Sequence, residues 1–302
     1  MTDAREHVRY EINHIERAGV ARLGDFIVHR TVDIIKHRPG QTPLGKRRTT
    51  FGDAPEHDLT DIHQAMIEKE PVTVILSQKG WIRGAKGHLP LDQDFKYKEG
   101  DGPAFVIHAQ TTDKLLLATD KGRFFTLGAD KLPGARGFGE PVRLLIDMDE
   151  SAEPVALFKY SPDRKLLLAS TSGHGFVVAE KELPAIKRAG RQVLNVIAGH
   201  KAMMALPMTG DRIAVLGENK KLLVFAADEI PEMVRGKGVR LLGGKAGEVA
   251  DITVFNAEEG LVRVDPAGRR HLVEDWRYYE GKRAQAGKLA PRGFSSKSFG
   301  GR

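Results

Sequence analysis

An apolar segment, a short polar turn and a second apolar segment recur five times along this chain. The five stretches are VTVILSQKGWI from Val72, KLLLATDKGRFFTL from Lys114, KLLLASTSGHGFVV from Lys165, RIAVLGENKKLLVF from Arg212 and GLVRVDPAGRRHLV from Gly260. The ninth position is Gly80, Gly122, Gly173 and Gly268 in four of them, and Lys220, directly after Asn219, in the fourth stretch. A tight hairpin turn needs a residue that accepts positive φ at this point, which glycine does freely. Each stretch therefore predicts a β-hairpin.

A second marker repeats with the same spacing. The hairpins start 42, 51, 47 and 48 residues apart, and a Leu-Pro or Ile-Pro pair at positions 132, 183 and 230 follows three of them. A basic loop containing glycine comes after each pair. These loops span residues 134–140, 186–192 and 234–240, and we assign segments 82–88 and 282–288 to the same series.

A period of 40 to 50 residues with several short strands in each unit predicts a β-propeller-type array. One small sheet cannot bury both of its faces, so neighbouring sheets stack against each other. We expect an all-β, five-bladed, propeller-like domain over residues 72–293. An ordinary all-β repeat protein, whose loops have no special function, remains an alternative at this point.

The residues before the repeats follow a helical pattern instead. Apolar residues of segment 3–37 approximate one stripe, which ends at Pro39-Gly40. We therefore predict a short α-helical N-terminal segment (1–42), a polar linker (43–71) with a short helix from Asp58 to Glu68, and a basic tail (294–302) after the repeats.

Composition excludes several classes of protein. The chain has no cysteine, so disulfides and thiolate metal sites are impossible, which is consistent with a reducing cytoplasm. No apolar run is long enough to span a bilayer, and the N-terminus is charged where a signal peptide would be apolar. We expect a cytoplasmic protein without a membrane partner.

The positive charge is unevenly distributed. The net charge is +7, but residues 281–302 contain six Lys and Arg and no acidic residue, so the first 280 residues carry only +1. A uniform positive field over the body of the protein is therefore excluded. Any nucleic-acid binding requires basic residues gathered on one face.

Motifs for catalysis or metal binding are weak. The eleven histidines form no HExxH arrangement, and residues 238–247 resemble a phosphate-binding loop but place Ala246 where Ser or Thr would hold magnesium. Ser172-Gly173-His174 falls in a predicted hairpin turn, and we interpret it as a turn. We expect no metal, cofactor or catalytic residue in this chain.

The recurring basic loops are the better candidate site. Glycine lets a backbone approach a phosphate closely, and Arg and Lys supply the charge. Equivalent loops of a closed array lie along one rim, which suits backbone binding and bending of duplex DNA without base reading. The alternative is that these side chains only solvate exposed loops. The candidate phosphate contacts are Lys79, Arg83, Lys86, Lys121, Arg123, Arg136, Lys187, Arg188, Arg191, Arg235, Lys237 and Arg240, with Lys282 and Arg283 in the fifth unit.

Long stretches of the sequence resemble a known family. They are KRRTTFGDAP, EPVTVILSQKGWIRGAKGH, AQTTDKLLLATDKGRFFTLGADKLPGARGFGEPVRLLIDMD, GENKKLLVF and EIPEMVRGKGVRL. They are similar to the C-terminal domain of the A subunit of bacterial DNA topoisomerase IV, and more distantly to that of the gyrase A subunit. The resemblance covers roughly residues 43–302.

The resemblance implies a β-pinwheel, in which blades exchange strands and a basic outer rim contacts and bends DNA. No unit here has the full basic box that drives wrapping in gyrase, which implies modest bending. The family enzyme passes one duplex through another, assisting decatenation and relaxation, with Mg and with ATP hydrolysed on its B subunit. The partners implied are duplex DNA, the catalytic core and the B subunit.

This sequence has no room for the family's DNA-gate region with its nucleophilic tyrosine. Arg9-Tyr10 resembles the Arg-Tyr pair of that active site, but the surrounding domain is missing, and we interpret the pair as part of a helix. We therefore expect no catalysis by this chain alone. The two rival functions are a protein-binding propeller without a DNA role and an intact topoisomerase activity.

Overall fold

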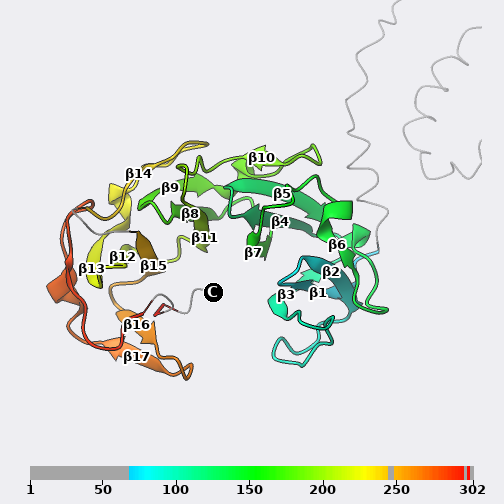
Figure 1. Ribbon diagram of the computed structural model, residues 1–302, viewed down its shortest axis with the longest axis horizontal. Coiled ribbons are helices and arrows are strands. Elements are labelled where there is room, and N and C mark those ends of the chain that lie inside the picture. Colours follow the sequence, from blue (N-terminus) through cyan, green and yellow to red (C-terminus); the bar gives the residue numbers. More distant parts are fainter. Residues whose placement is uncertain (1–67, 244–247, 296–297, 300–302) are drawn as a thin grey trace, which may run out of the picture. The chain divides into compact units, whose positions relative to one another are not determined.

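The computed structural model describes residues 68–243, 248–295 and 298–299 (Figure 1). Within these ranges the chain forms four four-stranded antiparallel sheets and one two-stranded sheet, joined by loops and short 3-10 helices, and it contains no α-helix. The all-β prediction is confirmed for this part. The predicted helical segment (1–42) and residues 43–67 of the predicted linker lie outside the described residues.

Each four-stranded sheet is built from one hairpin and two further strands. The first sheet holds β1 (Pro71–Ser77), β2 (Trp81–Lys86), β3 (Pro103–Gln110) and β6 (Glu140–Pro141). The second holds β4 (Lys114–Thr119), β5 (Arg123–Gly128), β7 (Pro154–Lys159) and β10 (Arg191–Gln192). The third holds β8 (Lys165–Ser170), β9 (His174–Ala179), β11 (Ala202–Pro207) and β14 (Val239–Arg240). The fourth holds β12 (Arg212–Gly217), β13 (Lys221–Ala226), β15 (Val249–Phe255) and β18 (Lys288–Leu289). The two-stranded sheet pairs β16 (Leu261–Val264) with β17 (Arg270–Val273).

All five predicted hairpins are present, and their turns have the expected geometry. The four turn glycines have φ between +75° and +80°, and Lys220 adopts φ +59° in the fourth turn. Gly122 is also closely packed, because a Cβ atom there would lie 2.0 Å from the carbonyl oxygen of Leu194. Glycine is therefore required in the second hairpin for two reasons, conformation and space.

The last strand of each four-stranded sheet comes from the following repeat. Strand β6, for example, follows the β4–β5 hairpin in sequence but pairs with β2 of the preceding sheet, and β10, β14 and β18 repeat this arrangement. We call the residues that lead into and out of these strands the exchange segments: 132–147, 183–195, 230–243 and 281–289.

A glycine with positive φ precedes each exchanged strand. These glycines are Gly139, Gly190, Gly238 and Gly287, with φ between +69° and +82°. A Cβ atom at any of them would lie 2.2 to 2.8 Å from a carbonyl oxygen of the strand that receives the exchange. Real Cβ atoms do not approach so closely, so the glycines of the basic loops serve strand exchange.

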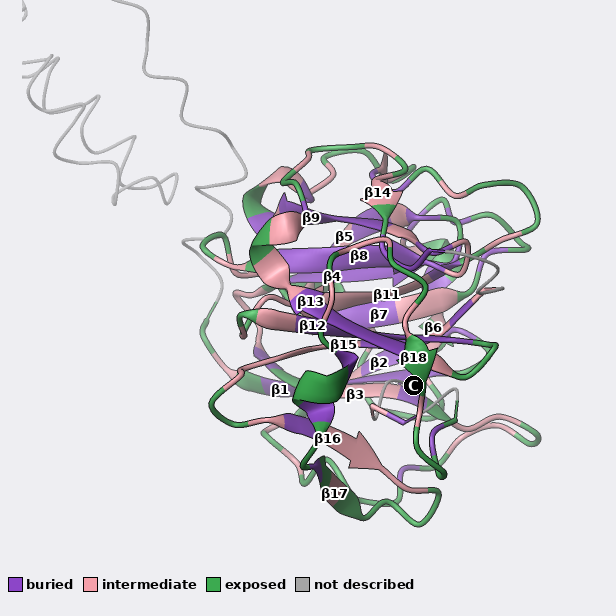
Figure 2. Ribbon diagram, turned by 90° about the vertical axis from the view of Figure 1, so that its left-hand side faces the viewer, coloured by how far each residue is buried: buried purple, intermediate pink, exposed green. Residues whose placement is uncertain are grey.

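The core lies within and between the sheets. Strands such as β4 and β8 read as unbroken apolar runs because both of their faces are covered, and all residues after the first are buried. Neighbouring sheets contact each other through β3, β7, β11 and β15, and one apolar cluster joins the second, third and fourth sheets. Figure 2 shows β4 and β8 largely buried, whereas many of the loops around the sheets are exposed.

The fifth unit departs from the prediction of five similar blades. In the fifth unit, no strand of the described residues other than β16 pairs with β17, and Ser298 O lies against β16, where it accepts a hydrogen bond from Val264 N. Phe294 and Ser298, which fall in the predicted basic tail, are buried. The fifth unit is thus a hairpin covered by C-terminal residues.

The assignment of segment 82–88 to the basic loops is wrong. Residues 81–86 form β2, which pairs with β1 on one side and with β6 on the other. Glycine and basic residues make this segment look like a loop, but pairing on both sides places it inside a sheet. Segment 282–288, by contrast, leads into the exchanged strand β18 and so belongs with the basic loops, as assigned.

Candidate nucleic-acid interface

The four exchange segments form one continuous edge, because each is hydrogen-bonded to the next. Asp147 N donates to Arg188 O, which joins the first segment to the second. Asn195 N and Gly236 O join the second to the third, and Gly243 N and Gln285 O join the third to the fourth. Figure 1 shows β10 and β14 on the outer side of the array and β7 and β11 on the inner side. We call this surface the exchange edge.

Basic residues are concentrated on three of the four exchange segments. Loops 186–192, 234–240 and 282–288 each contain three Lys or Arg and no acidic residue. The charged residues of loop 134–140 are Arg136 and Glu140, so this loop is neutral overall. The positive charge of the exchange edge therefore begins at the second segment.

Four of the predicted contacts hold the exchange segments in place. Arg83 is 6% exposed and donates to the carbonyl oxygens of Gly137 and Lys96. Arg123 donates to Ala189 O at 2.6 Å, and thereby fixes the second exchange segment to β5.

The other two arginines join exchange segments to their surroundings. Arg188 donates to Leu144 O at 2.6 Å and lies 3.6 Å from Asp147. Arg283 donates to Arg240 O and to Glu229 O. Because all four guanidinium groups satisfy backbone carbonyls, their primary role in this structure is to hold the loops.

Seven predicted contacts have free cationic groups on the exchange edge. Their side chains make no hydrogen bond or ion pair with any residue in the described ranges, and six of the seven are exposed, Arg191 being half-buried. They are Arg136, Lys187, Arg191, Arg235, Lys237, Arg240 and Lys282. These are the side chains that the structure leaves available to a polyanion.

Three further predicted contacts lie outside the exchange segments. Lys79 and Lys121 are in hairpin turns, and Lys121 Nζ lies 3.9 Å from Asp120 Oδ2. Lys86, at the end of β2, pairs with Glu70 at 3.2 Å. The fourteen candidates therefore do not all belong to the exchange segments.

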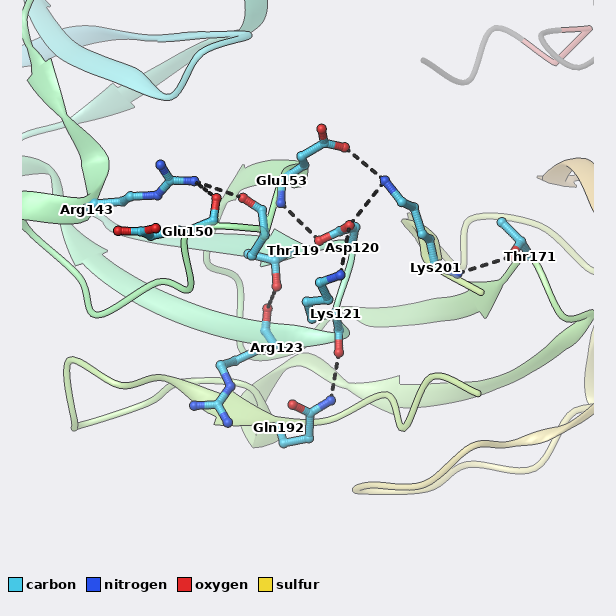
Figure 3. A network of polar contacts seen from close by, with 11 residues as sticks. Thr119, Asp120, Lys121, Arg123, Arg143, Glu150, Glu153, Thr171, Gln192 and Lys201 are labelled. Atoms are coloured by element: carbon cyan, nitrogen blue, oxygen red, sulfur yellow. Dashed lines mark hydrogen bonds and ion pairs between the residues drawn. The ribbon is translucent and has the colours of Figure 1, made fainter. Parts of the chain in front are cut away.

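No sequence pattern predicted the polar junction between the second and third sheets, which Figure 3 shows. Asp120 is 1% exposed, and its carboxylate accepts from Glu153 N at 3.0 Å and lies 3.4 Å from Lys201 Nζ. Lys201 also reaches Glu153 at 3.2 Å, so Glu153 first and Asp120 second raise its pKa. Ala202 N donates to Asp120 O, which completes the link. The only sequence signal is a charged residue before three inner strands (Glu153, Lys201, Glu248), which is easily missed.

Among the described residues, no group of three His, Cys, Asp or Glu side chains is arranged to hold a metal. No helix in the same ranges is long and apolar enough to cross a membrane. The open groove beside the first exchange segment, of about 720 Å³, is lined mainly by Gly and Pro with Lys86, Arg136 and Glu140.

Sheets completed by a strand from the next repeat define the protein as a propeller-like β-pinwheel. The family described as "DNA gyrase C-terminal domain, beta-propeller" matches residues 113–150, 164–196 and 212–256. The A subunit of DNA topoisomerase 4 from Caulobacter vibrioides is 48% identical over 269 residues, which cover 87% of this chain and 35% of that protein. The protein of the same name from Rickettsia bellii is 42% identical over 270 residues, 89% of this chain and 36% of that protein.

A solved structure agrees with these relatives. The E. coli ParC C-terminal domain has a TM-score of 0.66 and 26% identity, and the match covers 75% of this chain and 96% of that one. The chain belongs to the family of C-terminal β-pinwheel domains found in the A subunits of topoisomerase IV and gyrase. It spans about a third of the length of the curated relatives it matches.

Proposed function

We propose that the exchange edge binds the backbone of duplex DNA without reading its sequence. The observation that carries this proposal is the set of seven free cations on consecutive, mutually hydrogen-bonded segments. A solvated loop has no need to align its charges with those of the next repeat. A row of cations along one edge suits contact with the line of phosphates on a duplex.

Contact with more than one exchange segment requires the duplex to bend. The segments belong to successive sheets, which follow an arc in Figure 1, whereas short DNA is stiff. Bending a site of 20 to 30 base pairs by 40° to 90° costs on the order of 1 to 6 kcal/mol. The neutral first segment and the moderate number of free cations support modest bending over tight wrapping.

The relatives suggest the setting of this activity. They are subunits of DNA topoisomerase 4, and we propose that this domain holds duplex DNA beside the catalytic core of such an enzyme, together with its B subunit. In this proposal ATP hydrolysis, magnesium and strand cleavage belong to those other parts. The domain assists strand passage but does not relax or cleave DNA alone.

Binding by charge reversal variants tests the proposal. Arg235→Glu lies on the exchange edge, and Lys114→Glu is a matched control at an exposed lysine outside it. Fluorescence anisotropy should show weaker binding for Arg235→Glu on several unrelated duplexes alike, and wild-type affinity for Lys114→Glu. Equal loss in both variants would indicate non-specific attraction to the whole protein. No salt-dependent DNA binding by the wild-type chain would favour the rival function, a protein-binding propeller.

A further inference from the structure

His174 occupies a position that is basic in the neighbouring units. It directly follows the glycine of its hairpin turn, and the equivalent residues are Arg123 in the second unit, Lys221 in the fourth and Arg269 in the fifth. The third unit therefore has a titratable group where its neighbours have permanent positive charge. This row belongs to the hairpins and is separate from the basic loops of the exchange segments.

The strand pairing brings His174 to the exchange edge. His174 on β9 lies directly opposite Arg240 on the exchanged strand β14. Residues directly opposite on antiparallel strands point to the same face, with Cβ atoms about 5 Å apart. Lys237 lies three residues before Arg240 in the same segment, and both cations are exposed.

The imidazole ring is oriented by its own turn. Nδ1 lies 3.2 Å from the carbonyl oxygen and 3.2 Å from the hydroxyl of Ser172, and that hydroxyl lies 2.8 Å from Ser170 Oγ. Donation from Nδ1–H to Ser172 O fixes the ring, while Nε2 has no partner among the described residues. Nε2 is then the atom that can meet an external group, and it becomes a donor when the ring is protonated.

The charges around His174 are positive. Burial comes first in lowering its pKa, the bond to Ser172 O opposes this, and Lys237, Arg240 and His200 lower it further. No acid of the described ranges is among the groups that shift this pKa, and Glu248 lies 3.2 Å from His200 rather than on His174. The cluster therefore lacks a counter-ion, which a bound phosphate would supply.

We propose that His174, Lys237 and Arg240 together form a binding site for one phosphate of the DNA backbone, with His174 Nε2 as a donor in its protonated form. This inference rests on the proposed DNA binding and adds a proton-linked contact to it. The phosphate compensates the positive groups that disfavour protonation, so DNA and a proton bind to this site cooperatively. As the pH falls from a value at which His174 is neutral to one at which it is protonated in both states, the affinity for DNA rises about tenfold for each unit by which binding raises the pKa of His174.

The test measures duplex affinity at several salt concentrations, at pH 5.5 and at pH 8.0. In the wild-type protein the slope of log K against log salt should be steeper at pH 5.5 by about one phosphate contact, a change of about 0.9. His174→Gln should remove this pH-dependent increment. His174→Lys should keep the steep slope at both pH values. His108→Gln, which changes a histidine of the first sheet, should behave like wild type.

The outcomes separate this inference from the proposed function. If wild-type protein binds DNA with a strong salt dependence, but His174→Gln retains the full pH increment, the phosphate site is wrong and the exchange edge stands. If the wild-type protein does not bind DNA at either pH, both fail. An NMR titration gives a second measure: the pKa of His174 should rise when duplex is added, and an unchanged pKa would overturn the inference.

Discussion

Replacing Gly122 by alanine tests the close contact on which strand exchange depends. Gly122 has φ +75°, and an alanine Cβ would meet Leu194 O, the carbonyl that follows the exchanged strand β10. Gly122 O also accepts hydrogen bonds from Val193 N and Leu194 N, at 3.1 and 3.0 Å. The substitution therefore strains the turn and displaces the segment that completes the second sheet.

The matched control is Gly80→Ala, at the same turn position of the first hairpin. Its φ is +78°, but the nearest atom to a new Cβ is Val142 Cγ1 at an ordinary 3.7 Å. Alanine at positive φ costs about 1 to 2 kcal/mol, and the reduced entropy of the unfolded chain offsets about 0.4 to 1 kcal/mol of this. We expect a loss of about 1 kcal/mol for Gly80→Ala. For Gly122→Ala we expect about 2 kcal/mol more, because two hydrogen bonds of about 1 kcal/mol each are also disturbed.

Urea unfolding followed by circular dichroism measures both variants. The midpoint for Gly122→Ala should lie clearly below that for Gly80→Ala. Equal losses would refute the reasoning, since they would show that backbone conformation alone determines the cost. A normal stability for both would contradict the turn geometry itself.

Three further predictions concern single side chains. Burial is the main cause that raises the pKa of Asp251 to about 6, while hydrogen bonds from Phe299 N and other backbone groups lower it. The protonated carboxyl therefore contributes its full stabilisation of the fold below the ordinary pKa of 3.8, and this contribution is lost as the pH rises through 6. The protein should be less stable at about pH 7.5 than at about pH 3.8, and Asp251→Asn should reduce this difference in unfolding free energy by up to about 3 kcal/mol. Thermal melts measure it, and an unchanged pH profile would contradict this. Arg283→Ala leaves backbone carbonyls without donors and should lower the unfolding free energy by about 1 to 3 kcal/mol in urea unfolding. Lys282→Ala removes a side chain without a partner among the described residues and should leave the stability unchanged. Equal effects of the two substitutions would contradict the assignment of Arg283 as a holding residue and Lys282 as a free cation. Lys201→Ala should destabilise by about 1 to 3 kcal/mol because it removes a partner of a buried carboxylate, and adding Asp120→Asn should recover part of the loss; additive losses would argue against a direct pair.

Features set by local chemistry could be predicted from the sequence. The hairpins follow from apolar runs around a turn that needs positive φ, and Lys220 adopts this backbone conformation in the turn that has no glycine. The spacing of the repeats predicted stacked sheets, and four complete sheets are present in the described ranges. These properties depend on residues close to each other in the chain.

Features set by partners from another repeat could not be predicted in this way. Arg83 and Arg136 look alike in sequence, but only Arg83 has carbonyl oxygens from two loops within reach and becomes buried. Segment 82–88 resembles the basic loops until the strands on both sides of it are known. The fifth unit is a hairpin because the described residues supply no strand to β17 besides β16. The division between holding and free cations therefore depends on strand exchange.

The salt dependence of duplex binding tests the central claim most directly. If each of the seven free cations neutralises one phosphate, the slope of log K against log salt should approach about −6. Neutralising the third exchange segment in the variant Arg235→Gln, Lys237→Gln, Arg240→Gln should reduce the steepness by about 3. A slope near zero for the wild-type chain, or one that the triple variant leaves unchanged, would contradict DNA binding by the exchange edge.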